Sequence, residues 1–304
     1  MSATDYPTLA RKVRVVILAN HEERDLPMCL AGVPKGVGVT LIDSGSTDRT
    51  MDIAREHGAQ VIEHPFEGFA AQRNFALAEA DIKAEWVVFI DADEVFQKSF
   101  WDWAEKTLAA GDPPLDAVYV TSKLVLDGVV LEHAPAYPIY HSRFVRHGRA
   151  IFVDGDTSHN ETILRDLRTG KVDAPYLHYF QSGPLLPWMK KHLGLADEEV
   201  HEGEPTSGIR TGRALLNRAV GNGPLKALLR FFYHYFFCLG FLDGKAGLRY
   251  SAMYSWYEFS KWVMSLEDPT QPNVAWVKRL EAQANRAKAG GESQARPAAR
   301  VLNG

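Results

Sequence analysis

The chain contains the stretch Glu85-Trp-Val-Val-Phe-Ile90, which runs directly into Asp91-Ala92-Asp93-Glu94. Its apolar, β-branched and aromatic residues predict a strand buried within a sheet. Three acids where such a strand ends repel one another and are costly to desolvate, so folding alone does not explain them. A cluster of this kind usually holds a cation, and we expect one here.

A second stretch upstream has the same form. Val37-Gly-Val-Thr-Leu-Ile42 leads into Asp43-Ser44-Gly45-Ser46-Thr47-Asp48. Two apolar strands would then deliver carboxylates to one edge of a sheet, where open α/β sheets bind ligands. The pattern indicates a site for a metal and a polar, phosphorylated ligand.

Between residues 13 and 111, short β-branched runs alternate with helical stretches, which is typical of an open, mostly parallel α/β sheet. The expected strands cover 13–19, 38–42, 60–63 and a segment ending at Asp91, and the expected helices cover 22–30, 48–57 and 68–80. Ser46 or Thr47 is expected to cap the second helix, and Gly58 to end it.

Downstream of residue 112 the pattern changes. Asp127-Gly128 between the apolar runs 118–126 and 129–131 predicts a tight hairpin, and with it an antiparallel edge to the sheet. From residue 184 the pattern is mainly helical. We expect a nucleotide-binding and catalytic domain over 12–183, a helical C-terminal region over 184–281, and a flexible tail over 282–304.

Composition narrows the class of protein. The 304 residues are 46% apolar with a formal net charge of -4, so the chain has no overall basic field and nucleic acid is not an expected partner. Cys29 and Cys238 have no metal-type or redox spacing, which favours unpaired thiols in a reducing compartment. The N-terminus lacks the pattern of a secretory signal, so a cytoplasmic location is expected.

Asp91 and Asp93 are the first candidates for chemistry. Two carboxylates at i and i+2 on a turn can converge on one divalent cation, and hard oxygen ligands suit Mg²⁺ or Mn²⁺. A solvated, capped turn is the alternative interpretation of an isolated Asp-x-Asp.

Four motifs occur in order along the chain: Ala19-Asn20-His21-Glu22, the Asp43 stretch, Gly68-Phe-Ala-Ala-Gln-Arg73-Asn74, and Asp91-Ala92-Asp93. This series resembles the family 2 glycosyltransferases over roughly residues 13–180. The forms Leu41 to Asp48, His64 to Phe69 and Gly240 to Gly244 look most like the lipopolysaccharide core β-1,4-glucosyltransferase group. The resemblance implies a GT-A-like fold and a nucleotide-sugar donor.

The resemblance also implies residue roles. Asp43 would bind the base of a uracil-type nucleotide, Arg73 would lie near the phosphates, and Asp91 would meet the ribose or the metal. Asp93 would be the principal metal ligand, and His178 would complete the Mn²⁺ or Mg²⁺ shell. The implied donor-binding residues are Ala19, Asn20, Glu22, Asp43, Ser44, Arg73, Asp91 and Ala92. A surface ion pair is the alternative for Glu22 and Arg73.

An inverting transfer needs a base for the acceptor hydroxyl. The related group has an adjacent His-Glu pair after the hairpin; here Glu161 fits the glutamate, but Asn160 precedes it and His159 is displaced by one. Glu161 is our first choice of base and Asp156 the second. A turn-stabilising acid is the alternative.

The C-terminal region has an aromatic segment, Phe231 to Phe237, followed by further Tyr and Trp residues up to Trp262. It can be a helical core, or an interfacial surface with the nearby basic residues Lys226, Arg230, Lys245, Arg249 and Lys261. The apolar run after Arg230 is about a dozen residues, which is short for a membrane span. The second interpretation implies a peripheral position on the cytoplasmic face of the inner membrane.

The expected function is inverting transfer of a hexose from a nucleotide sugar, UDP-linked, to a hydroxyl of a cell-surface glycan or glycolipid such as a lipopolysaccharide core. A polyprenyl phosphate acceptor, which needs no base, is one alternative. A nucleotide-sugar-binding protein without turnover is another. Dehydrogenase, kinase and serine-hydrolase motifs are absent from the sequence.

Overall fold

The computed structural model describes residues 6–135, 138–154, 161–163, 166–202, 223–267 and 279. The chain divides into two compact units, residues 1–262 and 263–304. Every helix and strand given below begins in the first unit.

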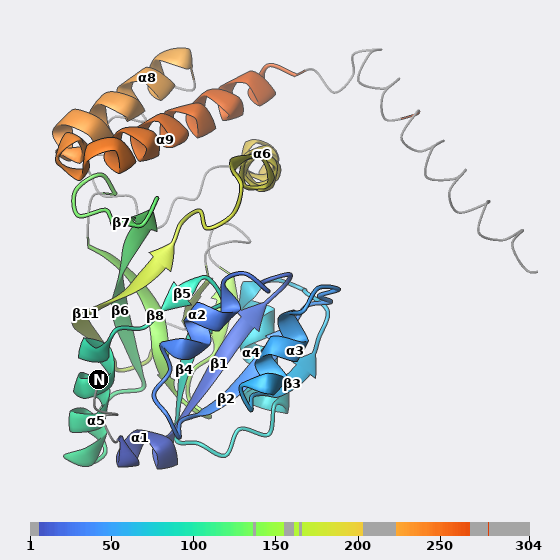
Figure 1. Ribbon diagram of the computed structural model, residues 1–304, viewed down its shortest axis with the longest axis vertical. Helices are drawn as coiled ribbons and strands as arrows, with labels where there is room; N and C mark the ends of the chain where they lie inside the picture. Colours follow the sequence, from blue (N-terminus) through green and yellow to red (C-terminus); the bar gives the residue numbers. More distant parts are fainter. Residues whose placement is uncertain are drawn as a thin grey trace, which may run out of the picture. The chain divides into compact units, whose positions relative to one another are not determined.

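The first unit contains a nine-stranded sheet whose first half is parallel (Figure 1). Four strands lie side by side in the order β3-β2-β1-β4: Gln60–Glu63, Gly38–Asp43, Val13–Ala19 and Trp86–Asp91. The helices that connect or flank them are α1 (Pro7–Lys12), α2 (Leu26–Ala31), α3 (Thr50–Glu56), α4 (Phe69–Glu79) and α5 (Lys98–Ala109). The parallel α/β sheet expected from the alternating pattern is confirmed.

Both faces of the central strands β1 and β4 are largely buried, as continuous apolar strands require. Val15 and Ile17 of β1 point into a core formed with α1, α2, α3 and α5. Val16, between them, belongs to a second core formed with α4 and with Phe152. Alternate residues of β1 therefore pack into two different cores. Packing on both sides fixes the position of the strand and of its carboxyl end.

The second half of the sheet is mixed. Its strands are β5 (Glu94–Val95), β6 (Ala117–Leu126), β7 (Val129–Val130), β8 (Ile139–Arg146) and β11 (Thr169–Tyr179). β8 runs antiparallel to both β4 and β6, β11 runs parallel to β6, and β5 pairs antiparallel with β11 at the sheet edge. β9 (Phe152–Asp154) and β10 (Glu161–Ile163) form a separate antiparallel pair. The expected antiparallel edge is thus present, and a further antiparallel strand, β8, lies inside the sheet.

Turn chemistry was predicted well in one place and wrongly in another. Asp127 and Gly128 have φ values of 53° and 76°, so the β6-β7 hairpin has the positive-φ turn that Asp-Gly favours. The prediction that Ser46 or Thr47 caps α3 is wrong: the Asp48 carboxylate accepts from the Thr50 amide at 3.0 Å instead. The Ser46 hydroxyl is engaged by Asp43.

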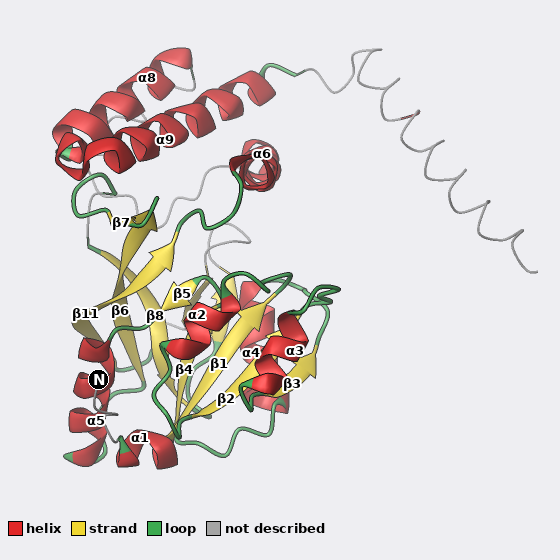
Figure 2. Ribbon diagram, viewed as in Figure 1, coloured by secondary structure: helices red, strands yellow, loops and turns green. Residues whose placement is uncertain are grey.

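The C-terminal part of the first unit is helical (Figure 2). It comprises α6 (Leu185–Glu202), α8 (Pro224–Phe232), the π-helical turn η1 (Tyr233–Phe237), the 3-10 turn η2 (Gly240–Asp243) and α9 (Gly244–Ser265). Tyr250 and Met253 of α9 pack on Leu124 and Leu126 of β6 and on Leu131. The described residues after 184 are thus mainly helical, the division at residue 183 stays a prediction, and the tail 282–304 lies outside the described residues.

Candidate active site

The carboxyl ends of β1, β2 and β4 lie level with one another. Ala19 pairs in register with Asp43, and Leu18 pairs with Asp91. The acids that follow these strands therefore emerge at one edge of the sheet, at the point where the strand order turns from β1 to β4.

The Asp43 loop is held by its own first residue. The Asp43 side chain is fully buried, and its carboxylate accepts from the amides of Gly45 at 3.0 Å and Ser46 at 2.8 Å and from the Ser46 hydroxyl at 2.5 Å. Gly45 has a φ of 94°, which favours glycine at this turn. Asp43 thus shapes the loop, and its contact with a nucleotide base stays a prediction.

The loop after β1 is bonded to the Asp43 loop. The side-chain amide of Asn20 donates to the Ser44 carbonyl at 3.0 Å. The backbone amide of His21 donates to the Ser46 hydroxyl at 2.8 Å. The Glu22 amide donates to the Thr50 hydroxyl at 2.8 Å. The residues expected at a donor base and ribose therefore form one rigid double loop.

The Gln-Arg-Asn motif on α4 connects three separate parts of the site. Gln72 donates to the Ser44 hydroxyl at 2.8 Å, and Arg73 donates to Asp91 Oδ1 at 3.1 Å. Asn74 exchanges two hydrogen bonds with the backbone of Phe152, at 2.8 Å and 2.9 Å. One helical turn therefore fixes the ends of β2, β4 and β9.

The burial of Arg73 differs from the sequence-based expectation. Its side chain is fully buried, and its guanidinium lies 5.7 Å from the ring centroids of both Phe89 and Phe152. A group enclosed in this way has no surface with which to contact phosphates in this conformation. Its contact with Asp91 instead makes it a residue that positions the acidic turn.

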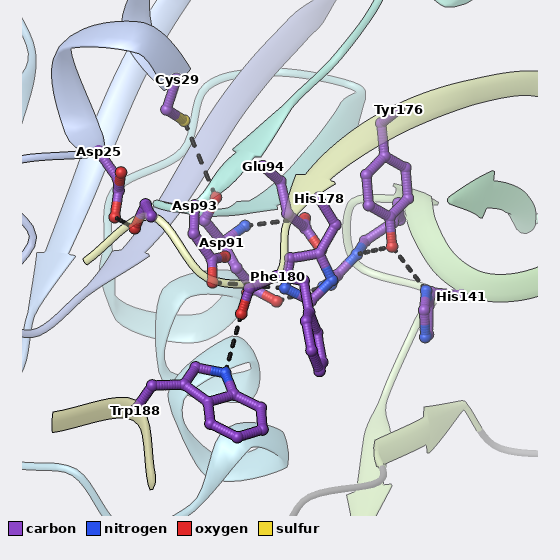
Figure 3. Close-up of polar contacts among 12 residues, drawn as sticks. Asp25, Cys29, Asp91, Asp93, Glu94, His141, Tyr176, His178, Phe180 and Trp188 are labelled. Atoms are coloured by element: carbon purple, nitrogen blue, oxygen red, sulfur yellow. Dashed lines mark hydrogen bonds and ion pairs between the residues drawn. The ribbon is translucent and has the colours of Figure 1, made fainter. Parts of the chain in front are cut away.

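Asp91 belongs to a buried network that the sequence did not indicate (Figure 3). Arg143 of β8 donates to Asp91 Oδ2 at 2.6 Å and to Glu94 Oε1 at 2.5 Å, and the Asp91 amide donates to Glu94 Oε2 at 3.0 Å. Burial acts to raise the pKa of Asp91, but the guanidinium groups of Arg143 and Arg73 outweigh it and hold that pKa well below its ordinary value. Asp91 therefore remains ionised, and its charge is matched from within the protein.

Asp93 faces His178 in the same view. Asp93 Oδ2 lies 3.4 Å from His178 Nε2, and about a third of each side chain is exposed. The pairing of His178 with Glu94 between β11 and β5 brings the imidazole to this turn. Burial acts to lower the pKa of His178, but Asp93 and the neighbouring acids raise it to about 9.

The donor set of this pair suits a divalent cation. A carboxylate and an imidazole are ordinary ligands of Mn²⁺, and a hard ion completes its shell with water and phosphate oxygens. Among the described residues, no group of three or more His, Cys, Asp or Glu side chains is arranged to hold a metal ion. Asp93 and His178 therefore fit such an ion as two ligands of a shared shell rather than as a closed protein site.

Glu22 lies close enough to this pair to feel the Asp93 charge. Burial, together with the nearby carboxylates of Asp93 and Asp25, raises the pKa of Glu22 to about 8. A carboxyl group whose pKa is shifted in this way among other acids is typical of a site that binds a cation or another charged ligand. Lys191 of α6 opposes the shift, so α6 also faces this cluster.

The segment that follows β11, which contains Phe180 and Ser182, contacts the loop after β1 and helix α6. The Ser182 hydroxyl donates to the Asp25 carboxylate, and Arg24 donates to the Ser182 carbonyl at 2.7 Å. The Trp188 indole of α6 donates to the Phe180 carbonyl at 3.0 Å (Figure 3). These contacts fasten the start of the helical region to the strand that carries His178.

The two candidate bases cannot be placed in the same way. Glu161 begins β10, where its backbone pairs with Asp154, and its side chain lies outside what the structure describes. Asp156 lies wholly outside the described residues. Both assignments remain predictions from the sequence.

With this geometry, the first unit contains a GT-A-like α/β domain: a mostly parallel sheet with acids gathered at its carboxyl edge. The sequence profile described as Glycosyl transferase family 2 matches residues 15–123, which span β1 to β6. This segment is similar to the domain that the profile describes. The closer likeness to the lipopolysaccharide core group stays a prediction.

Curated proteins similar to this chain include two named as glycosyltransferases. An uncharacterized glycosyltransferase of Rickettsia bellii is 31% identical over 120 residues, which cover 39% of this chain and 40% of that protein. The chain thus spans about two fifths of the length of this relative. An uncharacterized glycosyltransferase of Rickettsia prowazekii is 25% identical over 248 residues, covering 77% of this chain and 80% of the relative.

Solved structures with some similarity include two bacterial proteins in complex with uridine nucleotides. One is glucosyl-3-phosphoglycerate synthase from Mycobacterium tuberculosis in complex with Mn²⁺, UDP and phosphoglyceric acid (20% identity, TM-score 0.40, covering 66% of this chain and 81% of that one). The other is Staphylococcus aureus TarS 1-349 in complex with UDP-GlcNAc (15% identity, TM-score 0.43, covering 84% and 90%).

Proposed function

We propose that this protein transfers a hexose, with inversion, from a UDP-linked sugar to a hydroxyl of a cell-surface glycan such as a lipopolysaccharide core. The observation that carries the proposal is the Asp93 and His178 pair, together with the Asp43 double loop in the segment that matches the Glycosyl transferase family 2 profile. The double loop would receive the nucleoside, and the pair would lie at the diphosphate.

In the proposed reaction, the acceptor hydroxyl attacks the anomeric carbon while the bond to the diphosphate breaks. A bound Mn²⁺ or Mg²⁺ would neutralise charge on the leaving diphosphate. Asp93 and His178 would hold that ion, and Asp91 would meet the ribose in an orientation set by Arg73 and Arg143. Glu161, or failing that Asp156, would take the proton of the acceptor hydroxyl.

The acceptor would lie on the side closed by α6 and the segment after β11, where Trp188 and Lys191 come near the acidic cluster. We propose that it is a lipid-anchored glycan and that the protein works on the cytoplasmic face of a membrane. In the described part of the chain, no single helix is long and apolar enough to cross a bilayer.

The test is product formation from a panel of UDP-sugars with a membrane glycan extract, with and without Mn²⁺. Asp93→Asn should reduce turnover by at least about 100-fold because a metal ligand is lost. Asp81→Asn is the matched control, since Asp81 is exposed and its φ of 46° also suits asparagine. Equal turnover of Asp93→Asn and wild-type protein with every donor would refute the proposal.

A further inference from the structure

The C-terminal hairpin of helices exposes an unusual amount of apolar surface. We use the name hairpin face for six large side chains that are 43% to 84% exposed: Leu228, Phe232, Phe236, Phe237, Phe241 and Leu242. Stacked rings connect Phe232 to Phe236, so the face continues from α8 into η1. A monomeric protein in water rarely gathers large apolar groups in this way without a partner for them.

The shape of the hairpin holds this face outward. A Cβ on Gly240 would lie 2.5 Å from the His234 carbonyl oxygen, and a Cβ on Gly247 would lie 1.9 Å from the Gly240 oxygen. Only glycine permits so close an approach, so the bend between η1 and α9 is tightly packed. Phe237, at the bend, is 84% exposed.

The inner side of the bend is anchored to the sheet domain. The Asp243 carboxylate accepts from the amides of Glu132, His133 and Ala134 at 3.1 Å, 3.0 Å and 2.8 Å. His234 Nδ1 lies 2.7 Å from the Ala134 carbonyl oxygen. The hairpin face is therefore presented in a fixed orientation with respect to the loop after β7.

The exposed charge of the hairpin itself favours an anionic partner. From residue 223 to 257 the sequence contains one acid, Asp243, and four basic residues. Lys226 and Arg230 are buried against Glu258, and Arg249 pairs with Asp127. Asp243 is turned inward, with 4% of its side chain exposed, whereas Lys245 is exposed at the start of α9. An apolar surface with an exposed lysine beside it is typical of an interfacial membrane helix.

Length and composition point the same way. The segments Pro224–Phe237 and Gly240–Ser265 together are apolar enough for a membrane span, but they are bent by 74° at the break between them. A hairpin of this form can enter one leaflet without crossing the bilayer.

We propose that the hairpin face inserts into one leaflet of an anionic bilayer and that the Asp243 anchor thereby sets how the active site faces the membrane surface. This insertion goes beyond the proposed membrane location because it specifies the protein surface that binds, the leaflet depth that it reaches and the charge of the lipid. It does not depend on glycosyl transfer, because insertion needs neither donor nor metal.

The test is flotation of the full chain with vesicles of phosphatidylcholine, alone or mixed with phosphatidylglycerol. Wild-type protein should float with the mixed vesicles, and the double variant Phe236→Ser and Phe237→Ser should bind at least about tenfold more weakly. Ile151→Ser is the matched control because Ile151 is 51% exposed but lies outside the hairpin face. Lys245→Glu should weaken binding to the anionic vesicles only.

Donor binding separates this proposal from the proposed function. The double variant should keep the wild-type thermal shift with UDP and Mn²⁺, which also shows that it is folded. Wild-type protein that does not float, or a double variant that binds vesicles as tightly as wild type, would overturn the proposal. A wild-type dimer in light scattering that the double variant loses, without vesicle binding, would assign the face to a second copy and also overturn it.

Discussion

Replacement of Arg73 by methionine distinguishes a positioning role from direct contact with a ligand. Arg73 is fully buried, and it donates at 3.1 Å to an Asp91 carboxylate whose side chain is 28% exposed. Arg73→Met keeps the length of the side chain and its packing against Phe89 and Phe152 but removes the positive charge. Asp91 would keep its ion pair with Arg143, so its negative charge would lose one of two neutralising guanidinium groups rather than both.

The expected cost follows from this arrangement. Removal of one partner of a buried ion pair costs about 3–5 kcal/mol, and the remaining contact with Arg143 argues for the lower end, about 3 kcal/mol. For a unit of this size, that loss corresponds to a decrease in melting temperature of about 6–12 °C. Arg49→Met is the matched control: Arg49 pairs with Glu56 on the surface, so its loss should cost less than about 1 kcal/mol.

The assay is urea unfolding at neutral pH, followed by UDP titration of the folded variant. We expect lower stability together with weaker donor binding, because the acidic turn is displaced. If Arg73→Met unfolded at the wild-type urea concentration and only lost affinity for UDP, Arg73 would contact the phosphates directly and our account of it would be wrong.

Three further predictions concern other parts of the molecule. Burial acts to raise the pKa of Glu258, but Lys261, Arg230 and Lys226 lower it to about 2. This shift contributes ~3 kcal/mol to the free energy of unfolding. Because the folded-state pKa is depressed, that contribution is present above pH 4.5 and is lost as the pH falls toward 2. Urea unfolding across this range should show the loss, and a flat profile would contradict it. Asp243→Ala should destabilise the protein by ~3 kcal/mol in the same assay, since three backbone amides lose their buried acceptor, and an unchanged midpoint would exclude the anchor. Glu161→Gln should lower turnover by at least about 100-fold without changing UDP affinity if Glu161 is the base, whereas unchanged turnover would favour a phosphate acceptor.

The sequence predicted the parallel half of the sheet well because each of its strands carries its own signal. β3 and the end of β4 lie where the apolar runs ended, at Glu63 and Asp91. Parallel strands with crossover helices leave few choices of topology, so the acids could be assigned to one sheet edge before any coordinates. The predicted start of α2 was less accurate, because the helix begins at Leu26 rather than at residue 22, with Pro27 in its first turn.

The network around Asp91 could not be predicted in the same way. Arg143 lies on β8, which enters the sheet antiparallel beside β4, and no local pattern encodes that long-range register. The available signal was a charged residue between Ser142 and Phe144 in a strand that is otherwise buried there. The contact between Arg73 and Asp91 was missed for a related reason: an arginine in a ligand-binding motif suggests a phosphate contact, and no local pattern indicates an acid at the end of β4 as its partner.

The most direct test of the central claim is calorimetric titration of UDP into the protein with and without Mn²⁺, repeated for Asp93→Asn and for the control Asp81→Asn. We predict that Mn²⁺ tightens UDP binding by at least about tenfold in the wild-type and control proteins and has no effect in Asp93→Asn. UDP affinity that is the same with and without Mn²⁺ in the wild-type protein would contradict the claim that Asp93 and His178 hold a cation at the diphosphate.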